Sequence, residues 1–187
     1  MKNHNNTYPN FSFFKSPVTN IYPAKTIGLL DAYKAISGKY FAKQTQQLRL
    51  ISDKKKNREY KASRFPYVCF SGIFSKRNEK SLIKHSGLIA IDFDHLENVK
   101  KTKLQLIKDP YFETQLLFVS PNGNGIKWVI EIEVSEQYPH GEMFRAIYNY
   151  ILKTHLIEVD RACKDLSRAT FLCHDPEAWI HPKYLII

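Results

Sequence analysis

The spacing of hydrophobic and polar positions along the chain changes between two periods, and this pattern predicts an α+β fold. Short apolar or alternating runs predict strands at residues 66–71, 88–93, 115–119, 127–134, 159–160 and 169–173. Apolar positions at helical spacing predict helices at residues 26–36, 40–51, 96–107 and 144–155. The order strand, helix, strand, strand, helix, strand is that of a ferredoxin-like or RRM-like sheet with helices packed on it.

The same pattern predicts one domain with an N-terminal helical extension. Residues 1–24 contain three prolines and are predicted to be an irregular lead-in, and residues 25–187 form the domain. Within it, residues 25–64 are a helical, basic segment and residues 65–182 are an acidic-site core. A membrane partner is not expected, because no apolar run approaches the ~20 residues that span a bilayer. The start of the chain lacks an apolar signal core, and the three cysteines show no paired spacing, so a cytoplasmic protein with reduced, buried thiols is predicted.

Two carboxylates end the most apolar run of the chain. Residues 88–93 read as a strand buried on both faces, and alternation places Asp92 and Asp94 on the same side. Two buried like charges repel each other, and a divalent cation would remove that cost. We expect Asp160 to complete a catalytic and metal site for Mg²⁺ or Mn²⁺. The alternative is that the pair only caps the loop and the helix that follow the strand.

A glycine-rich turn follows the next predicted strand. Its two glycines leave backbone N–H groups free to face a phosphate, and a lysine adds a positive charge beside them. Arg168 is able to pair with a phosphate in a bidentate manner. The alternative is an ordinary hairpin turn, for which Asn-Gly is a common solution. The predicted nucleotide-binding residues are Ser120, Gly123, Gly125, Lys127 and Arg168.

Charge is distributed unevenly along the chain. Residues 1–91 carry 17 Lys and Arg against 4 Asp and Glu, whereas residues 92–187 carry 11 against 14. Such a basic half is typical of proteins that bind a polyanion, with nucleic acid the leading candidate. The alternative is a solvated helix face followed by a mobile basic loop at residues 53–58. The predicted nucleic-acid-binding residues are Lys54, Lys55, Lys56, Arg58, Lys61 and Arg64.

Together these features predict metal-dependent nucleotidyl transfer. Carboxylates would hold the cations, and the turn with its lysine would hold a nucleoside triphosphate. Two alternatives remain open. One is a catalytically inactive DNA-binding module that depends on the basic half of the chain, and the other is a metal-dependent nuclease that uses the same acids.

Several short motifs occur in order at residues 59–61, 66, 70–74, 86–94, 120–127, 160–168 and 171–176. Through them the chain resembles the VirE N-terminal domain family of bacterial mobile-element proteins, a relative of the archaeo-eukaryotic primase–polymerase core. The resemblance covers residues 22–182. It implies a primase–polymerase-type sheet, with Asp92 and Asp94 as the first acidic motif and Asp160 as the third.

The resemblance also implies a biological context. It places the chain in a mobile-element or replication protein that binds DNA or RNA and acts with a helicase-like ATPase, in the same chain or in a partner. The second motif of such cores resembles Gly-x-Gly-x-His, and Lys127 stands here where the histidine is expected. This departure weighs against polymerase activity and favours binding without primer extension.

Overall fold

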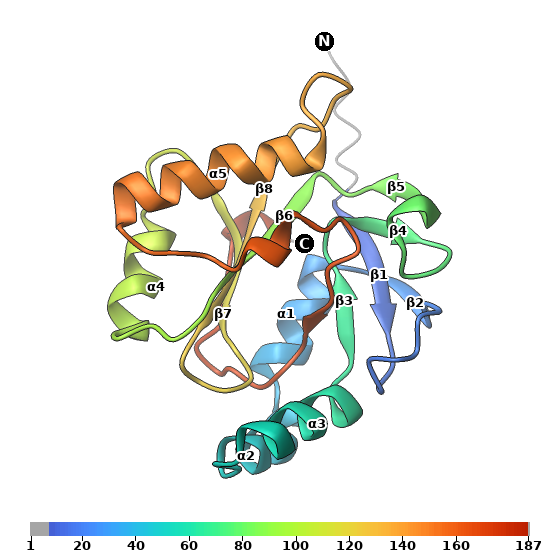
Figure 1. Ribbon diagram of the computed structural model, residues 1–187, viewed down its shortest axis with the longest axis vertical. Helices are drawn as coiled ribbons and strands as arrows, with labels where there is room; N and C mark the ends of the chain where they lie inside the picture. The colour runs from blue at the N-terminus through green and yellow to red at the C-terminus, as the bar shows by residue number, and fades with distance from the viewer. Residues whose placement is uncertain (1–7, 187) are drawn as a thin grey trace.

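The computed structural model describes residues 8–186 and shows an α+β fold, which confirms the predicted fold class (Figure 1). The strands are β1 (Asn10–Phe14), β2 (Lys25–Gly28), β3 (Tyr67–Cys69), β4 (Gly72–Phe74), β5 (Leu82–His85), β6 (Leu88–Phe93), β7 (Thr114–Val119), β8 (Ile126–Glu131), β9 (Thr170–Phe171) and β10 (Trp179–Ile180). The α-helices are α1 (Leu29–Ser37), α2 (Ala42–Arg49), α3 (Lys54–Arg64), α4 (Val99–Ile107) and α5 (His140–His155). Short 3-10 helices are η1 (Lys39–Phe41), η2 (Glu79–Ser81), η3 (Arg161–Lys164) and η4 (Pro182–Tyr184).

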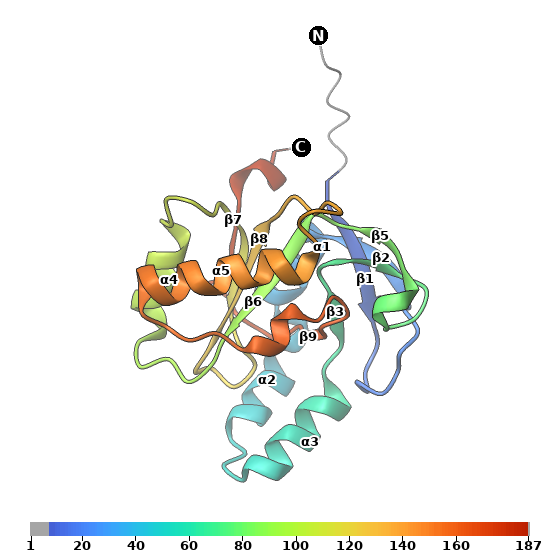
Figure 2. The same cartoon turned by 45° about the horizontal axis from the view of Figure 1, so that its top comes forward.

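One antiparallel sheet carries the strand with the acidic end. Its strands lie in the order β10-β7-β8-β6, and α4 and α5 cover one of its faces (Figures 1 and 2). Because side chains alternate along a strand, Ile89 and Ile91 of β6 pack toward these helices. Leu88 and Ala90 pack on the opposite, inner face. Asp92 continues the inner series and is 2% exposed.

Three strands and two helices of this sheet follow one another along the chain in the predicted order. Along the chain β6, α4, β7, β8 and α5 follow one another, and in space β8 lies between β6 and β7. The strand predicted at residues 159–160 is wrong. There the Asp160 N–H donates to the Asp92 carbonyl oxygen at 3.0 Å, but the Asp160 side chain accepts from the Ala162 N–H and so begins η3 instead.

A second sheet, ordered β2-β1-β3-β9, corrects the prediction for the start of the chain. Residues 1–24 are not irregular throughout, because β1 is an inner strand of this sheet. Phe11 and Phe14 are fully buried and belong to different hydrophobic clusters, so both faces of β1 are covered. Five residues flanked by prolines carry too little periodicity to reveal such a strand. The lead-in prediction for residues 1–7 lies outside the described residues.

The predicted N-terminal helical extension is wrong for α1, which lies in the core. Leu29, Ala32 and Ile36 are buried in one cluster with residues of both sheets, and Figure 1 shows α1 at the centre of the molecule. Strand β2 occupies residues 25–28, so the helical segment begins later than predicted. Helices α2 and α3 project beyond the two sheets (Figure 2).

The basic run at residues 53–58 belongs to helix α3 and is not a loop. Asp53 is the N-cap, and its side chain accepts a hydrogen bond from the Lys56 N–H at 2.8 Å. No residue of α3 is fully buried. Side-chain hydrogen bonds connect it to α2 instead, since Asn57 donates to the Leu48 carbonyl oxygen and Tyr60 to Gln47. This polar attachment keeps the basic side chains of α3 at the surface.

The glycine-rich turn closes the hairpin between β7 and β8. The Ser120 N–H donates to the Gly125 carbonyl oxygen at 2.8 Å, and the Gly123 N–H donates to the Ser120 carbonyl oxygen at 2.9 Å. Gly123 has a φ of +85°, which favours glycine. A Cβ on Gly125 would overlap the carbonyl oxygen of Phe93. Close approach of the turn to the end of β6 therefore requires a glycine at residue 125.

Two simpler expectations concern the cysteines and the membrane. Cys69, Cys163 and Cys173 are free and buried, as predicted. In the part of the chain from residue 8 to residue 186, every helix is too short or too polar to cross a membrane.

Replacing Gly125 with alanine tests the role of the close approach. We expect Gly125→Ala to lower the free energy of unfolding by ~1–3 kcal/mol, because the backbone of β6 or of the turn must move. Chemical denaturation measures the change. Gly141→Ala is the matched control, since a Cβ there meets nothing within 4 Å. Equal stability of the Gly125→Ala and Gly141→Ala variants would contradict the argument.

Candidate functional site

A cavity of about 570 Å³ lies at the acidic end of β6. The ends of β6 and β8, helix α3 and the segment that follows η3 contribute to its walls. Seven charged side chains line it, four of them basic and three acidic. They are Lys61, Arg77, Lys127, Arg168, Asp92, Asp94 and Asp165.

A buried ion pair forms the centre of this site. Asp92 and Lys127 are cross-strand partners in the antiparallel pairing of β6 and β8, so both side chains lie on the inner face of the sheet. The Lys127 Nζ lies 2.6 Å from the Asp92 Oδ2. Asp92 is 2% and Lys127 is 9% exposed. The lysine thus neutralises a carboxylate that would be costly to bury alone.

Arg168 joins Asp92 to Asp160. Its guanidinium group lies 3.5 Å from the Asp92 Oδ2 and pairs more closely with the Asp160 Oδ2. Burial of Arg168 opposes its charge, but Asp92 and Asp160 raise its pKa, so it remains a cation. The structure therefore brings Asp92 and Asp160 together, as the sequence predicts, and places the basic side chains of Lys127 and Arg168 beside them in the cavity wall.

Asp94 occupies a different environment from its two predicted companions. Although it lines the cavity, it is exposed. Its charge acts on Lys61, a residue of α3 that also lines the cavity. Burial and the charge of Lys127 lower the pKa of Lys61, whereas Asp94 and Asp92 raise it. Lys61 of helix α3 thus interacts electrostatically with both Asp92 and Asp94.

The residues able to hold a metal differ from the predicted set of three carboxylates. Among the described residues, one ligand atom each of Asp92, Asp160 and Cys163 lies within 4.8 Å of the others, and Asp94 is not part of this group. The Cys163 Sγ accepts a hydrogen bond from the Asp92 N–H, and burial raises the pKa of its thiol. A protonated thiol is a poor ligand for Mg²⁺ or Mn²⁺, which prefer oxygen.

One carboxylate oxygen nevertheless remains able to bind a cation. The Asp92 Oδ1 is buried and, among residues 8–186, has no hydrogen-bond partner. The second oxygen of the same carboxylate is occupied by Lys127 and Arg168. The residues present thus fit a cation held by Asp92 Oδ1 and Asp160, provided that Arg168 moves away from Asp160.

The glycine-rich turn does not form part of the cavity wall. Ser120, Gly123 and Gly125 are absent from its lining. Arg49 of α2 donates to the carbonyl oxygens of Ser120 and Pro121, so the turn is used to hold α2 against the sheet. Of the predicted nucleotide-binding residues, Lys127 and Arg168 lie in the cavity.

The predicted nucleic-acid-binding residues divide between several directions on α3. Lys54, Arg58 and Lys61 follow one another at spacings of four and three residues, so they share one face of the helix. Lys55 and Lys56 are exposed on other sides of α3. Arg64 lines a second cavity.

Sequence reasoning missed Arg77, which precedes η2 and lines the cavity. Its guanidinium group donates to the Val18 carbonyl oxygen at 3.3 Å, yet its Nε is buried and lacks a partner among the described residues. The basic pair Lys76-Arg77 was the only signal in the sequence, and such pairs are common on surfaces.

Comparison with known proteins corrects the predicted family. The family model described as BT4734-like, N-terminal domain, matches residues 59–179, well over half of the chain. This is a different family from the VirE N-terminal domain, so that resemblance and the primase–polymerase relation drawn from it are wrong. The expected helicase-like partner and the argument about a histidine at residue 127 lose their basis with it. Neither the curated proteins nor the solved structures gave a match.

The ion pair predicts that Asp92 and Asp94 contribute very differently to the free energy of unfolding. Asp92→Asn leaves Lys127 buried without its counter-charge, so we expect it to lower the free energy of unfolding by ~3 kcal/mol. Asp94→Asn, the matched control, changes an exposed group and is expected to shift it by less than ~0.5 kcal/mol. Urea denaturation of both variants measures this. An Asp92→Asn variant as stable as Asp94→Asn would show that the pair contributes nothing.

Proposed function

The chain belongs to the BT4734-like N-terminal domain family, and we propose from the geometry of its site that the domain binds nucleic acid. The exposed basic face of α3 contacts backbone phosphates. One phosphate group enters the cavity, where Lys61, Arg77 and Lys127 surround it. A nucleoside triphosphate offers the same groups and is a second ligand of this class.

Unused hydrogen-bonding groups in the cavity wall carry this proposal. Five buried side-chain nitrogen or oxygen atoms of the described residues lack a partner, and three belong to residues that line this cavity. Two of these three are the Nε donors of Arg77 and Arg168. Buried donors are normally satisfied. Phosphate oxygens, which accept several charge-assisted hydrogen bonds at once, would satisfy both.

The charge of the surroundings supports the same ligand. Lys54 and Arg58 are exposed on the face of α3 that leads to Lys61. Arg58 is close enough to lower the pKa of Lys61 further. The chain as a whole carries a net charge of +10. Such a series of cations attracts a polyanion and guides it toward the cavity.

We also propose that the sheet supporting this site is ferredoxin-like. In space the three strands lie in the order β6-β8-β7. Along the chain, α4 lies between β6 and β7, and α5 follows β8. Both orders support this interpretation. In such a sheet the fourth strand lies beside the first. The hydrogen bond from Asp160 to Asp92 lies at that edge of β6.

The Asp92 Oδ1, which has no partner in the described part of the chain, favours a second candidate function, metal-dependent chemistry on phosphate esters. Asp92 and Asp160 would hold one Mg²⁺ or Mn²⁺, which supplies Lewis acidity and can activate a hydroxyl group or water. Lys127 and Arg168 would stabilise negative charge on the phosphate. Nucleotidyl transfer and nuclease cleavage both fit this arrangement.

Nucleic-acid binding is tested with a pair of double variants. Lys54→Ala with Arg58→Ala removes two phosphate contacts, so we expect the slope of log affinity against log salt to fall by about 1.5–2. Affinity for DNA should fall about tenfold in low salt. Lys100→Ala with Lys101→Ala removes the same charge from exposed positions on α4 and should change affinity less than twofold.

Fluorescence anisotropy with a labelled oligonucleotide over a series of salt concentrations provides both quantities. Equal losses in the two double variants would indicate non-specific attraction to a basic protein. That result would overturn the role assigned to α3.

Metal binding is tested by titration with Mn²⁺ followed by calorimetry. We expect one site, lost in Asp160→Asn and retained in Asp94→Asn, because Asp94 lies outside the ligand group. Asp160 is partly exposed, so its replacement is tolerated by the fold, which circular dichroism checks. If Asp94→Asn abolishes the site and Asp160→Asn leaves it intact, the assigned ligands are wrong.

A further inference from the structure

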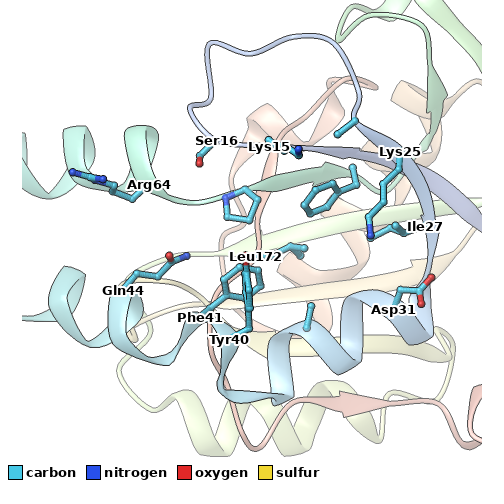
Figure 3. A pocket seen from close by; sticks show the side chains of 14 residues that line it. Lys15, Ser16, Lys25, Ile27, Asp31, Tyr40, Phe41, Gln44, Arg64 and Leu172 are labelled. Atoms are coloured by element: carbon cyan, nitrogen blue, oxygen red, sulfur yellow. The ribbon is translucent and has the colours of Figure 1, made fainter.

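A second and larger cavity, of about 840 Å³, lies on the inner side of the β2-β1-β3-β9 sheet (Figure 3). Strands β1 and β2, helix α1, the short helix η1 and the ends of α2 and α3 contribute to its walls. Its volume falls in the range of small-molecule sites, ~300–1,000 Å³. Neither the nucleic-acid proposal nor the metal candidate uses it.

Aromatic side chains form one part of this wall. Tyr40 is 85% exposed, although it is a large and partly apolar residue. Phe41 beside it is buried, and the two rings meet edge to face with centroids 4.9 Å apart. Figure 3 shows both rings on the same side of the cavity. The fixed Phe41 ring thus supports the exposed Tyr40 ring, which offers a free face for stacking.

A side chain with an unsatisfied hydrogen-bond donor lies next to these rings. The Nε2 of Gln44 is buried and has no hydrogen-bond partner among the described residues. Gln44 lies one turn after Tyr40 in the chain, and Figure 3 shows its amide group directed toward the cavity. A primary amide presents a donor and an acceptor side by side, which matches the edge of a nucleobase.

The charged groups around the cavity favour an anionic ligand. Lys15, Lys25 and Arg64 line it against a single acid, Asp31. The Asp31 carboxylate already accepts a hydrogen bond from the Gly28 N–H at 3.1 Å. Between residues 8 and 186, none of the three cations has an ion-pair partner within 4.0 Å. Lys25 lies over the Phe13 ring, 5.5 Å from its centroid, whereas Lys15 and Arg64 have no such contact in that range.

We propose that this cavity holds an unstacked base of single-stranded nucleic acid. The base stacks on Tyr40 and meets the amide of Gln44, while Arg64 and Lys15 contact the adjoining phosphates. The proposal deepens the nucleic-acid function proposed above and rests on it. Helix α3 connects the two cavities, because Lys61 lines the first and Arg64, three residues later, lines the second. One strand that follows α3 reaches both.

The test compares two single strands of equal length, one with ordinary bases and one abasic throughout its central part. Both carry the same phosphates, so their difference in affinity reports contacts with bases. We expect the chain to bind the ordinary strand about tenfold more tightly, which is the size of effect typical of one stacked base. Tyr40→Ala should remove most of this difference. Tyr111→Ala, the control at a 79% exposed tyrosine of another surface, should retain it.

A second variant separates binding from folding. Gln44→Leu replaces an amide whose donor is unsatisfied, so its melting temperature should equal or exceed that of the wild type. Its preference for the ordinary strand should nevertheless fall. Loss of preference with unchanged stability supports a binding role. An unchanged preference in both Tyr40→Ala and Gln44→Leu overturns the proposal.

The two proposals fail in different ways. Salt-dependent binding of both strands with equal affinity would overturn the base site and leave the phosphate-binding function standing. If the wild type binds neither strand at any salt concentration, the nucleic-acid function itself is wrong, and the base site is rejected with it.

Discussion

The buried contact between Asp92 and Lys127 is the constraint on which the functional part of this molecule depends. Both residues lie on the inner face of a sheet, in line with the apolar residues Leu88, Ala90 and Val129. Neither charge would be stable there alone, because burial of an unpaired charge is costly. The pairing of β6 with β8 places the two side chains opposite each other. Each charge then offsets the cost of burying the other inside an apolar layer. Arg168 then extends the pair to Asp160.

This arrangement gives the site a dual character. The carboxylates are neutralised by basic side chains, so the site resembles neither an open metal centre nor a simple basic patch. Among residues 8–186, the Nε donors of Arg77 and Arg168 lack a partner and favour a phosphate, whereas the Asp92 Oδ1 lacks a partner and favours a cation. A phosphate that arrives with a divalent cation would satisfy both at once, since it would exchange partners with the existing ion pairs. The two proposed functions are therefore compatible in one site.

Helix α3 gives this site its connection to the surface. Most of its residues are polar, side-chain hydrogen bonds attach it to α2, and the partly buried Tyr60 packs against the core. Its basic residues consequently remain exposed near one cavity and end at another. A helix buried by an apolar face could not present cations in so many directions. The small buried share of α3 thus leaves its cations available at the surface.

The sequence alone determined much of the sheet that contains β6. Strands β6, β7 and β8 and helices α4 and α5 have strong local periodicity, because each buries one face or both against a neighbour. It also identified Asp92, Lys127, Asp160 and Arg168 as residues of chemical interest. Strand β1 escaped notice, since its burial depends on β2, β3 and α1, which are distant in the chain or short. Local patterns do not report such contacts.

Only the tertiary structure decided what the candidate residues do together. The sequence placed Lys127 with the glycine turn, because the two are adjacent along the chain. Strand register instead pairs it with Asp92, 35 positions earlier in the chain, while Arg49 holds the turn. Asp94, two residues from Asp92, lies outside the group of Asp92, Asp160 and Cys163, because β6 ends at Phe93. Charges in a folded chain respond to distance in space and to burial, and neither quantity is a property of the sequence positions themselves.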